Sequence, residues 1–230
     1  MKISAIILAA GSGTRMGNVE NKQFISIDGE SVIRRSVRAF ENCDSISDIV
    51  VVCKESELDR FRTELGNDFV KLSSLIVGGK SRLDSAKIGF SKVENGADFV
   101  AIHDGARCLI TPDAIDKIVE AAKKYGAATA ASKVTDTIKQ CDENGKICAT
   151  VPRRMLYSAQ TPQVFSYELY KRALSALPEN HPEITDDNML LELIGADVYV
   201  VDTGLSNIKI TTPNDVSLAE LLVKKRCENE

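Results

Sequence analysis

The sequence contains no tryptophan, and all aromatic residues together make up 5% of its 230 residues. Proteins that bind single-stranded nucleic acid stack bases on aromatic side chains, so we expect no such surface here. A basic excess is also missing, because the formal net charge is −4. The composition therefore disfavours DNA or RNA as the main partner, although a local basic patch could still bind a small anion.

No apolar run approaches the roughly 18 residues of a transmembrane helix, so we expect no membrane partner. The apolar stretch Ile3–Ala10 resembles the core of a signal peptide, but a single lysine precedes it and a glycine-rich turn follows it. We therefore interpret it as a first buried strand. The six cysteines form no Cys-x-x-Cys pair, so zinc spacing is absent and we expect reduced thiols in a cytoplasmic protein.

Short apolar runs alternate with amphipathic stretches along most of the chain. Asp48–Cys53 has the β-branched character of a buried parallel strand, and Ser81 with Asp84 has the spacing of a capping box that begins a helix. The alternation predicts an α/β fold, a Rossmann-like and mostly parallel sheet with helices on both faces. The predicted strands are Ile3–Ala10, Asp48–Cys53, Leu72–Val77, Ala97–His103, Ala127–Ser132 and Ala196–Val201. The predicted helices are Ser31–Phe40, Glu55–Leu65, Ser81–Val93, one from Pro112, Ser166–Leu177, Asp186–Ile194 and one from Pro213.

The segment from Val134 to Gln160 has no helical period. Polar and apolar residues alternate on both sides of the turn sequence Asp142–Gly145, which predicts a β-hairpin over 134–151. We expect it to be an insertion in a single domain spanning 1–230. A two-stranded hairpin is marginal alone in water, so it should rest on a sheet edge or grip a second subunit.

A glycine-rich turn over 8–17 directly follows the first predicted strand. Backbone N–H groups of such a turn can face an anion, and the alternative is a simple strand-to-helix turn. A dinucleotide fingerprint fails because Met16 stands where its third glycine belongs, and a P-loop fails because no Gly-Lys-Ser/Thr follows. Arg15 and Lys22 add positive charge, which suits a triphosphate attacked at its α-phosphorus. The candidate phosphate contacts in the turn are Ala10, Gly11, Ser12 and Gly13.

Two further loops follow predicted strands. Gly79 and Ser85 lie where a helix begins, and they could contact a nucleotide or only cap that helix. Asp104 and Arg107 lie at the end of a strand, where open α/β sheets bind ligands, and a buried ion pair is the alternative. Asp104 could hold Mg²⁺. His103 ends an apolar strand, so a structural histidine is favoured over an acid or base.

Taken together, these motifs resemble the family of 2-C-methyl-D-erythritol 4-phosphate cytidylyltransferases, among the sugar- and polyol-phosphate nucleotidyltransferases, over nearly the whole chain. The resemblance is carried by Ala9–Gly17 with Lys22-Gln23-Phe24, His103–Arg107, Gln160–Phe165, Thr185–Asp187 and Asn207–Thr211. Ribitol 5-phosphate cytidylyltransferases share most motifs but often have Ala-Gly-Gly at 9–11 and His-Asp-Ser-Val-Arg at 103–107. Asn21 and Cys108 depart from the family, where proline is common, and should alter loop stiffness more than chemistry.

The resemblance implies a cytoplasmic homodimer of the non-mevalonate isoprenoid pathway, with the hairpin as a subunit-crossing arm. CTP is the implied co-substrate and Mg²⁺ the implied cofactor; the polyol phosphate attacks the α-phosphorus and pyrophosphate leaves. Arg15 and Lys22 match the pair that stabilises the transition state. The family positions that contact cytidine and the triphosphate correspond here to the Ala10–Gly13 backbone, Gly79 and Ser85. The family positions that bind the polyol phosphate substrate correspond here to Asp104, Arg107, Thr137, Arg153, Thr161, Thr185 and Lys209. A non-catalytic nucleotide-binding relative is the remaining alternative, and intact Arg15, Lys22, Asp104 and Lys209 argue against it.

Overall fold

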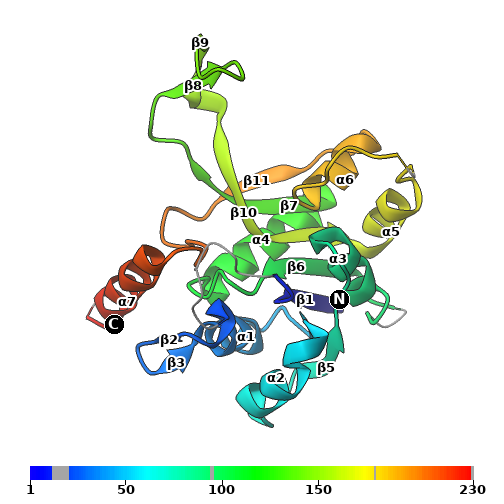
Figure 1. Ribbon diagram of the computed structural model, residues 1–230. Helices are drawn as coiled ribbons and strands as arrows, with labels where there is room; N and C mark the ends of the chain where they lie inside the picture. The colour runs from blue at the N-terminus through cyan, green and yellow to red at the C-terminus, as the bar shows by residue number, and fades with distance from the viewer. Residues whose placement is uncertain (12–20, 94–95, 179, 229–230) are drawn as a thin grey trace.

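A seven-stranded sheet forms the centre of the computed structural model, which describes residues 1–11, 21–93, 96–178 and 180–228 (Figure 1). In spatial order the strands are β11 (Tyr199–Asp202), β7 (Ala127–Lys133), β10 (Tyr157–Ser166), β6 (Phe99–Asp104), β1 (Ile3–Leu8), β4 (Asp48–Cys53) and β5 (Leu72–Val77). β1 pairs in parallel with β4 and β6, β4 with β5, and β7 with β11. The predicted α/β fold with a mostly parallel sheet is therefore confirmed.

Helices cover both faces of this sheet, as predicted. The helices are α1 (Val32–Glu41), α2 (Leu58–Leu65), α3 (Arg82–Phe90), α4 (Pro112–Tyr125), α5 (Tyr167–Ser175), α6 (Asn188–Leu193) and α7 (Pro213–Cys227). One core cluster joins the sheet to α1, α2 and α4, and a second joins it to α3, α5 and α6. Side chains of β1 alternate between the two, with Ile7 in the first and Ile6 in the second, as expected for a strand buried on both faces.

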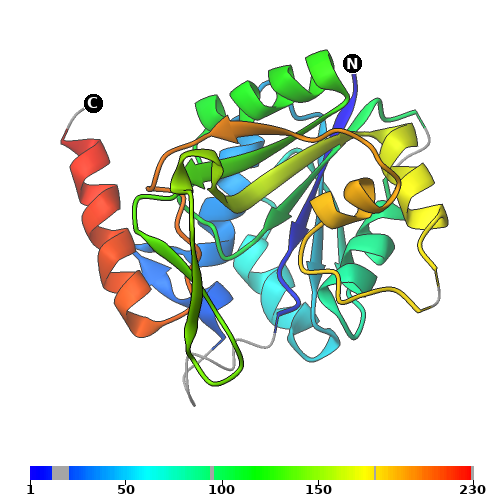
Figure 2. The same ribbon diagram turned by 90° about the horizontal axis from the view of Figure 1, so that it is seen from above.

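Helix α7 lies beside the sheet and belongs to neither of those layers. It packs through Ala219 and Val223 in a third apolar cluster that also holds Ile27 and Ile210. Figure 2 shows α7 at one side of the molecule and α5 and α6 at the opposite side. The short pair β2 (Ser26–Ile27) and β3 (Glu30–Ser31) lies next to α7. Within the described part of the chain, no helix has the length and apolar character needed to cross a membrane.

Local capping explains where two of the helices begin. Ser81 caps α3 and forms the predicted capping box with Asp84, which satisfies two backbone donors at the helix start. Thr111 caps α4, and Pro112 occupies its first turn, where the missing N–H of proline costs nothing.

Strand β10 was not predicted by the sequence pattern. It runs antiparallel between β6 and β7, and its register with β7 shifts between Ala159 and Gln163. Pro162 lies inside this irregularity, and proline in an apparent central strand argues against a strand. The polar residues on either side of it are buried, so the usual alternation of polar and apolar residues is lost.

The predicted hairpin is present, with both strands inside the predicted segment 134–151. β8 (Ile138–Cys141) and β9 (Ile147–Val151) pair with each other in an antiparallel sheet of their own. The hairpin projects away from the central sheet (Figure 1). Most of its residues are exposed, so in one chain it does not rest on the sheet edge that was one of the two alternatives.

Candidate functional site

A cavity of about 520 Å³ lies at the carboxyl ends of the parallel strands. Its walls come from the ends of β1 and β6, the loops after β4 and β5, the short helix η2 (Lys22–Phe24) and the segment before α7. Ligands bind at this edge in open α/β sheets. The residues that line it are Leu8, Ala10, Gly11, Lys22, Gln23, Lys54, Gly79, Lys80, Ser81, Arg82, Ser85, Asp104, Ala106, Lys209 and Thr211.

Several of the candidate residues from the sequence come together here. Those that line the cavity are Ala10, Gly11, Lys22, Gly79, Ser85, Asp104 and Lys209. Three others, Ser12, Gly13 and Arg15, lie outside the described residues. Segments that are far apart in the sequence therefore meet where the glycine-rich turn begins.

Asp104 is the centre of an ion-pair network in this cavity. Its Oδ2 lies 2.7 Å from Lys209 Nζ and its Oδ1 lies 3.2 Å from Arg82 Nε. Arg107 Nε is 4.0 Å from Oδ2. Burial alone would raise the pKa of Asp104, but the attraction of these three cations outweighs it and holds the pKa well below its usual range. Asp104 is therefore a carboxylate at all ordinary pH values.

Arg82 links Asp104 to a second buried carboxylate. Its Nη1 donates to Asp187 Oδ2 at 2.6 Å, and Tyr170 Oη donates to the other oxygen of Asp187 at 2.7 Å. Asp187 is fully buried. Burial would lower the pKa of Arg82, but the two carboxylates outweigh it and raise that pKa. No local pattern in the sequence pointed to this pair, because Arg82 and Asp187 are 105 positions apart.

His103 lies behind Asp104 as a structural residue. Its Nε2 is 3.2 Å from the carbonyl oxygen of Arg107, so Nε2 must carry the proton. Nδ1 then accepts from the hydroxyl of Thr161 at 3.0 Å, and that hydroxyl oxygen accepts the N–H of Asp104 at 2.9 Å. Burial lowers the pKa of His103 to about 3. The interpretation of His103 as a satisfied structural histidine is confirmed.

The loop that carries Lys209 is held by side-chain amides. Asn207 Nδ2 donates to the carbonyl of Thr161 at 2.9 Å and to Gln160 Oε1 at 3.0 Å. Arg107 Nη1 donates to the carbonyl of Asn207 at 2.9 Å. The irregular part of β10 therefore positions Lys209. Thr161 and Arg107, predicted to bind substrate, make these protein contacts and do not line the cavity.

The turn after β5 brings backbone close to the cavity. Gly79 N–H donates to Ser85 Oγ at 3.1 Å, and the Ser85 hydroxyl donates to the carbonyl of Ser81 at 3.0 Å. A Cβ on Gly79 would lie 2.3 Å from the Cβ of Asp84, so only glycine fits. The two interpretations of Gly79 and Ser85, a nucleotide contact and a cap of the helix, are compatible, because the residues that shape the start of α3 also line the cavity.

Cations dominate the described cavity wall. Lys22, Lys54, Lys80, Arg82 and Lys209 line it, whereas Asp104 is the single carboxylate among those lining residues. Lys54 and Lys80 were missed as site residues in the sequence. Both follow the ends of parallel strands, which is the signal that could have identified them. A wall of this charge suits a polyanion such as a triphosphate.

The described residues do not fit a preformed magnesium site. Among them no group of three or more His, Cys, Asp or Glu side chains could hold a metal ion. Both oxygens of Asp104, the candidate ligand, are engaged by Lys209 and Arg82. Mg²⁺ binds through one or two carboxylates plus substrate phosphates, and the described wall of the cavity offers no carboxylate free of an ion pair.

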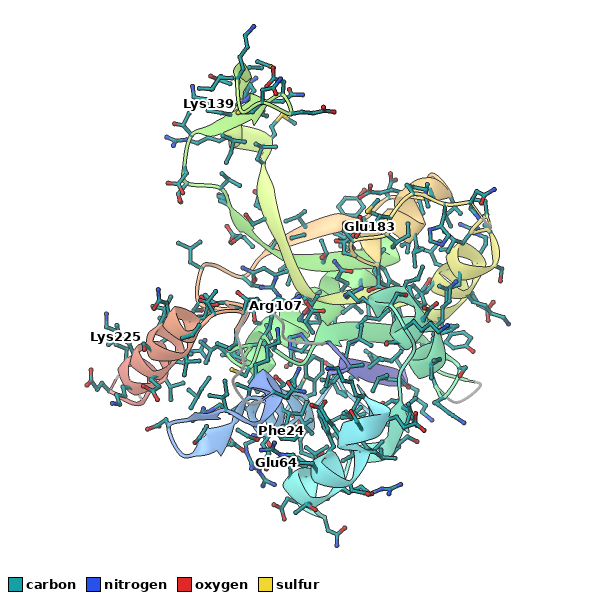
Figure 3. All side chains as sticks on the ribbon, in the orientation of Figure 1. Phe24, Glu64, Arg107, Lys139, Glu183 and Lys225 are labelled. Carbon is teal, nitrogen blue, oxygen red and sulfur yellow. The ribbon has the colours of Figure 1, made fainter. Side chains whose placement is uncertain are left out.

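Three predicted substrate contacts are not among the residues that line the cavity of their own chain. Thr137 is an exposed residue at the base of the hairpin, and Arg153 is exposed in the short helix η4 (Arg153–Met155), where it donates to the carbonyl of Thr135. Thr185 is exposed and donates to Met189 Sδ at 3.1 Å. In one chain, Thr137 and Arg153 therefore lie on or next to the projecting hairpin and not in the cavity wall that holds Lys209 (Figure 1). Figure 3 shows the hairpin, marked by Lys139, extending from the body of the molecule, where Arg107 lies.

Comparison with known proteins gives one family. The family model described as 2-C-methyl-D-erythritol 4-phosphate cytidylyltransferase matches residues 3–225. A protein of that name from Alkaliphilus oremlandii is 39% identical over 229 residues, covering 99% of this chain and 97% of its own. One from Caldanaerobacter subterraneus is 40% identical over 98% of this chain and 100% of its own.

Solved structures agree with these relatives. The crystal structure of 4-diphosphocytidyl-2C-methyl-D-erythritol synthase from Anaerococcus prevotii superposes with a TM-score of 0.86 at 28% identity, covering 97% of this chain and 98% of that one. The cytidylyltransferase from Thermus thermophilus superposes with a TM-score of 0.77 at 25% identity, covering 97% and 100% of the two chains.

Proposed function

The chain belongs to the 2-C-methyl-D-erythritol 4-phosphate cytidylyltransferase family, and we propose that it transfers CMP from CTP to 2-C-methyl-D-erythritol 4-phosphate. The observation that carries the proposal is the cation-lined cavity at the carboxyl edge of the sheet, beside the start of the glycine-rich turn. A nucleoside triphosphate brings three linked phosphates, and its charge is complementary to the five cations of that wall.

The reaction needs no covalent intermediate with the enzyme. A phosphate oxygen of the polyol phosphate forms a new bond to the α-phosphorus of CTP, and the bond from that phosphorus to the oxygen bridging to the β-phosphorus breaks. Pyrophosphate leaves with the electron pair. Catalysis then consists of positioning and of charge stabilisation. We assign charge stabilisation to Lys22 and, outside the described residues, to Arg15.

Nucleotide and polyol phosphate take different sides of the cavity in this proposal. The turn at Ala10 and Gly11, with Gly79 and Ser85, would hold the nucleotide. Lys209 would hold the phosphate of the polyol, because it lies in the cavity wall on Asp104. Asp104 and Arg107 would then act by fixing Lys209 and its loop. A divalent ion such as Mg²⁺ would arrive with the triphosphate.

The proposal includes a homodimer with shared sites. The hairpin over 134–151 is exposed and extends from the body (Figure 1), and such a ribbon needs a packing partner. Met155, Tyr157 and Ile147 on and near it are exposed large apolar side chains. A second subunit would cover them and would bring Thr137, Arg153 and Lys209 to one site. We propose Thr185 as a substrate contact only in this homodimer.

One assay tests the proposed function. Purified chain is incubated with CTP, Mg²⁺ and one polyol phosphate, and pyrophosphate release is measured. We expect release with 2-C-methyl-D-erythritol 4-phosphate. Release with ribitol 5-phosphate alone would move the chain to the related activity, and no release with either would make it a nucleotide-binding relative without catalysis.

A cytoplasmic location belongs to the same proposal, in keeping with the five free cysteines of the described residues.

A further inference from the structure

A side-chain hydrogen bond connects the segment that carries Lys22 to a distant part of the chain. Asn21 Nδ2 lies 2.7 Å from Oε1 and 2.6 Å from Oε2 of Glu57. Glu57 ends the short helix η3 (Glu55–Glu57), which leads directly into α2. The contact is therefore a bridge between the approach to Lys22 and a helix on the face of the sheet.

The same asparagine also begins η2. Its Oδ1 accepts the backbone N–H of Gln23 at 3.1 Å, which makes Asn21 the N-cap of the helix. The oxygen and the nitrogen of the Asn21 side-chain amide thus make hydrogen bonds to different parts of the chain. The oxygen fixes the helix from within, and the nitrogen fixes it to Glu57.

A helix of three residues cannot hold its own position. The internal backbone bonds of η2 are Phe24 N–H to the carbonyl of Asn21 at 2.9 Å and Ile25 N–H to that of Lys22 at 3.3 Å. Such short 3₁₀ segments gain little from internal hydrogen bonds. The position of η2 therefore depends on what it is attached to.

A second attachment leads to the same helix. The ring of Phe24 packs edge-on against Phe61 of α2, with centroids 4.8 Å apart, and the guanidinium of Arg60 lies 3.9 Å from the Phe24 centroid. Figure 3 shows Phe24 beside α2, the helix that carries Glu64. The apolar contact fixes one end of η2 and the Asn21–Glu57 contact fixes the other, with Lys22 between them.

We propose that Asn21 and Glu57 are positioning residues for Lys22. Neither lines the cavity, whereas Lys22 does and is 8% exposed. Breaking the contact would free the start of η2 and displace the ammonium group from the α-phosphorus. The inference rests on the proposed function, because it assumes that Lys22 acts on the transition state.

The first test separates positioning from substrate binding. We expect Glu57→Ala to lower kcat about 10- to 100-fold with KM for CTP within about twofold, since a misplacement of about 1 Å at a catalytic group costs that much. Glu57→Gln keeps an oxygen acceptor for the Asn21 amide and should retain most of the activity. Glu55→Ala is the matched control, because Glu55 is exposed in the same short helix. Equal loss in the Gln and Ala variants would overturn the proposal.

The second test is a double-mutant cycle on the contact itself. We expect Asn21→Ala to lower kcat alone and to lose no more when Glu57→Ala is added, because both changes remove the same contact. If Glu57→Ala were equally harmful in the Asn21→Ala background, Glu57 would act by another route and the proposal would be wrong.

A third readout does not depend on activity. Amide hydrogen exchange at Gln23–Ile25 should accelerate in Glu57→Ala and stay slow in Glu57→Gln and Glu55→Ala. If the wild-type chain released no pyrophosphate, the proposed function would fail while this measurement still tested the contact. Unchanged exchange in Glu57→Ala would overturn the positioning role even in an active enzyme.

Discussion

Lys209 Nζ lies 2.7 Å from Asp104 Oδ2, and this ion pair joins the end of β6 to the loop before α7. The other oxygen of the carboxylate holds Arg82 at the start of α3. One buried side chain therefore fixes two elements that are far apart in the sequence at the same edge of the sheet. The electrostatics of the cavity and the stability of the fold depend on the same group.

Removal of this carboxylate should destabilise the protein. Asp104→Ala leaves Arg82, Arg107 and Lys209 without their shared counter-charge, and breaking a buried ion pair in this way costs about 3–5 kcal/mol. Urea unfolding at pH 7 measures the loss. Asp59→Ala is the control, because its ion pair with Arg62 is on the surface and should contribute less than about 1 kcal/mol. Similar losses in both variants would contradict the assignment of Asp104 as the centre of the network.

Lys22→Ala should lower kcat far more than it changes the affinity for CTP. A group that stabilises charge arising only in the transition state acts on turnover, and loss of such a donor costs about a hundredfold or more. Steady-state kinetics with varied CTP separates the two effects. Lys92→Ala, an exposed lysine outside the cavity wall, is the control. A change in KM for CTP alone would reassign Lys22 to ground-state binding.

The sequence was sufficient for elements whose local signals agree. Asp48–Cys53 and Leu72–Val77 are strands with the bounds that the pattern predicted. The first is a continuous apolar run after Asp48, which is typical of a buried parallel strand. The start of α3 was equally clear, since Ser81 and Asp84 satisfy its first backbone donors locally. Loops after such strands must meet at one edge, so Lys22, Asp104 and Lys209 could be placed in one site.

Interactions between distant segments could not be predicted in this way. β10 is buried through polar residues whose partners lie elsewhere, as with Gln160 and Asn207, so it lacks the period of a strand. The pairing of Arg82 with Asp187 depends on how the fold brings the starts of α3 and α6 together, which no local pattern encodes. Asn21 was expected only to change loop stiffness, and its bond to Glu57 became visible only in three dimensions.

His103 should make stability depend on pH. Burial lowers its pKa to about 3 from 6.5, so between these values the unfolded chain binds a proton that the native chain does not. The contribution of His103 to the free energy of unfolding is therefore fully present above pH 6.5. Below that pH the free energy of unfolding should fall by about 1.4 kcal/mol per pH unit. Urea unfolding between pH 7 and 5 should show this slope, which His103→Gln should remove. The half-buried His181 is the control; loss of the slope in His181→Gln would contradict the prediction.

Arg153→Lys should raise KM for 2-C-methyl-D-erythritol 4-phosphate and leave CTP binding nearly unchanged. Lysine keeps the charge but loses the planar fork that binds phosphate through two N–H groups. Kinetics with each substrate varied, together with calorimetric titration of CTP, measure the two effects. Arg154→Lys is the neighbouring control. A large loss of CTP affinity with normal dependence on the polyol phosphate would put Arg153 on the other substrate, and no effect would make it a surface residue.

Mixing two inactive variants tests whether subunits share their sites. Lys22→Ala disables the cavity of its own chain, and Arg153→Ala disables the arm that the proposal gives to the neighbouring site. A mixed dimer then has one site with both defects and one with neither. After equal mixing and subunit exchange, half of the dimers are mixed, so activity should recover to about one quarter of the wild-type value. Chains that stayed inactive after proven exchange would place Lys22 and Arg153 in the same site of one chain, and a fully active monomer in sedimentation would remove the shared site altogether.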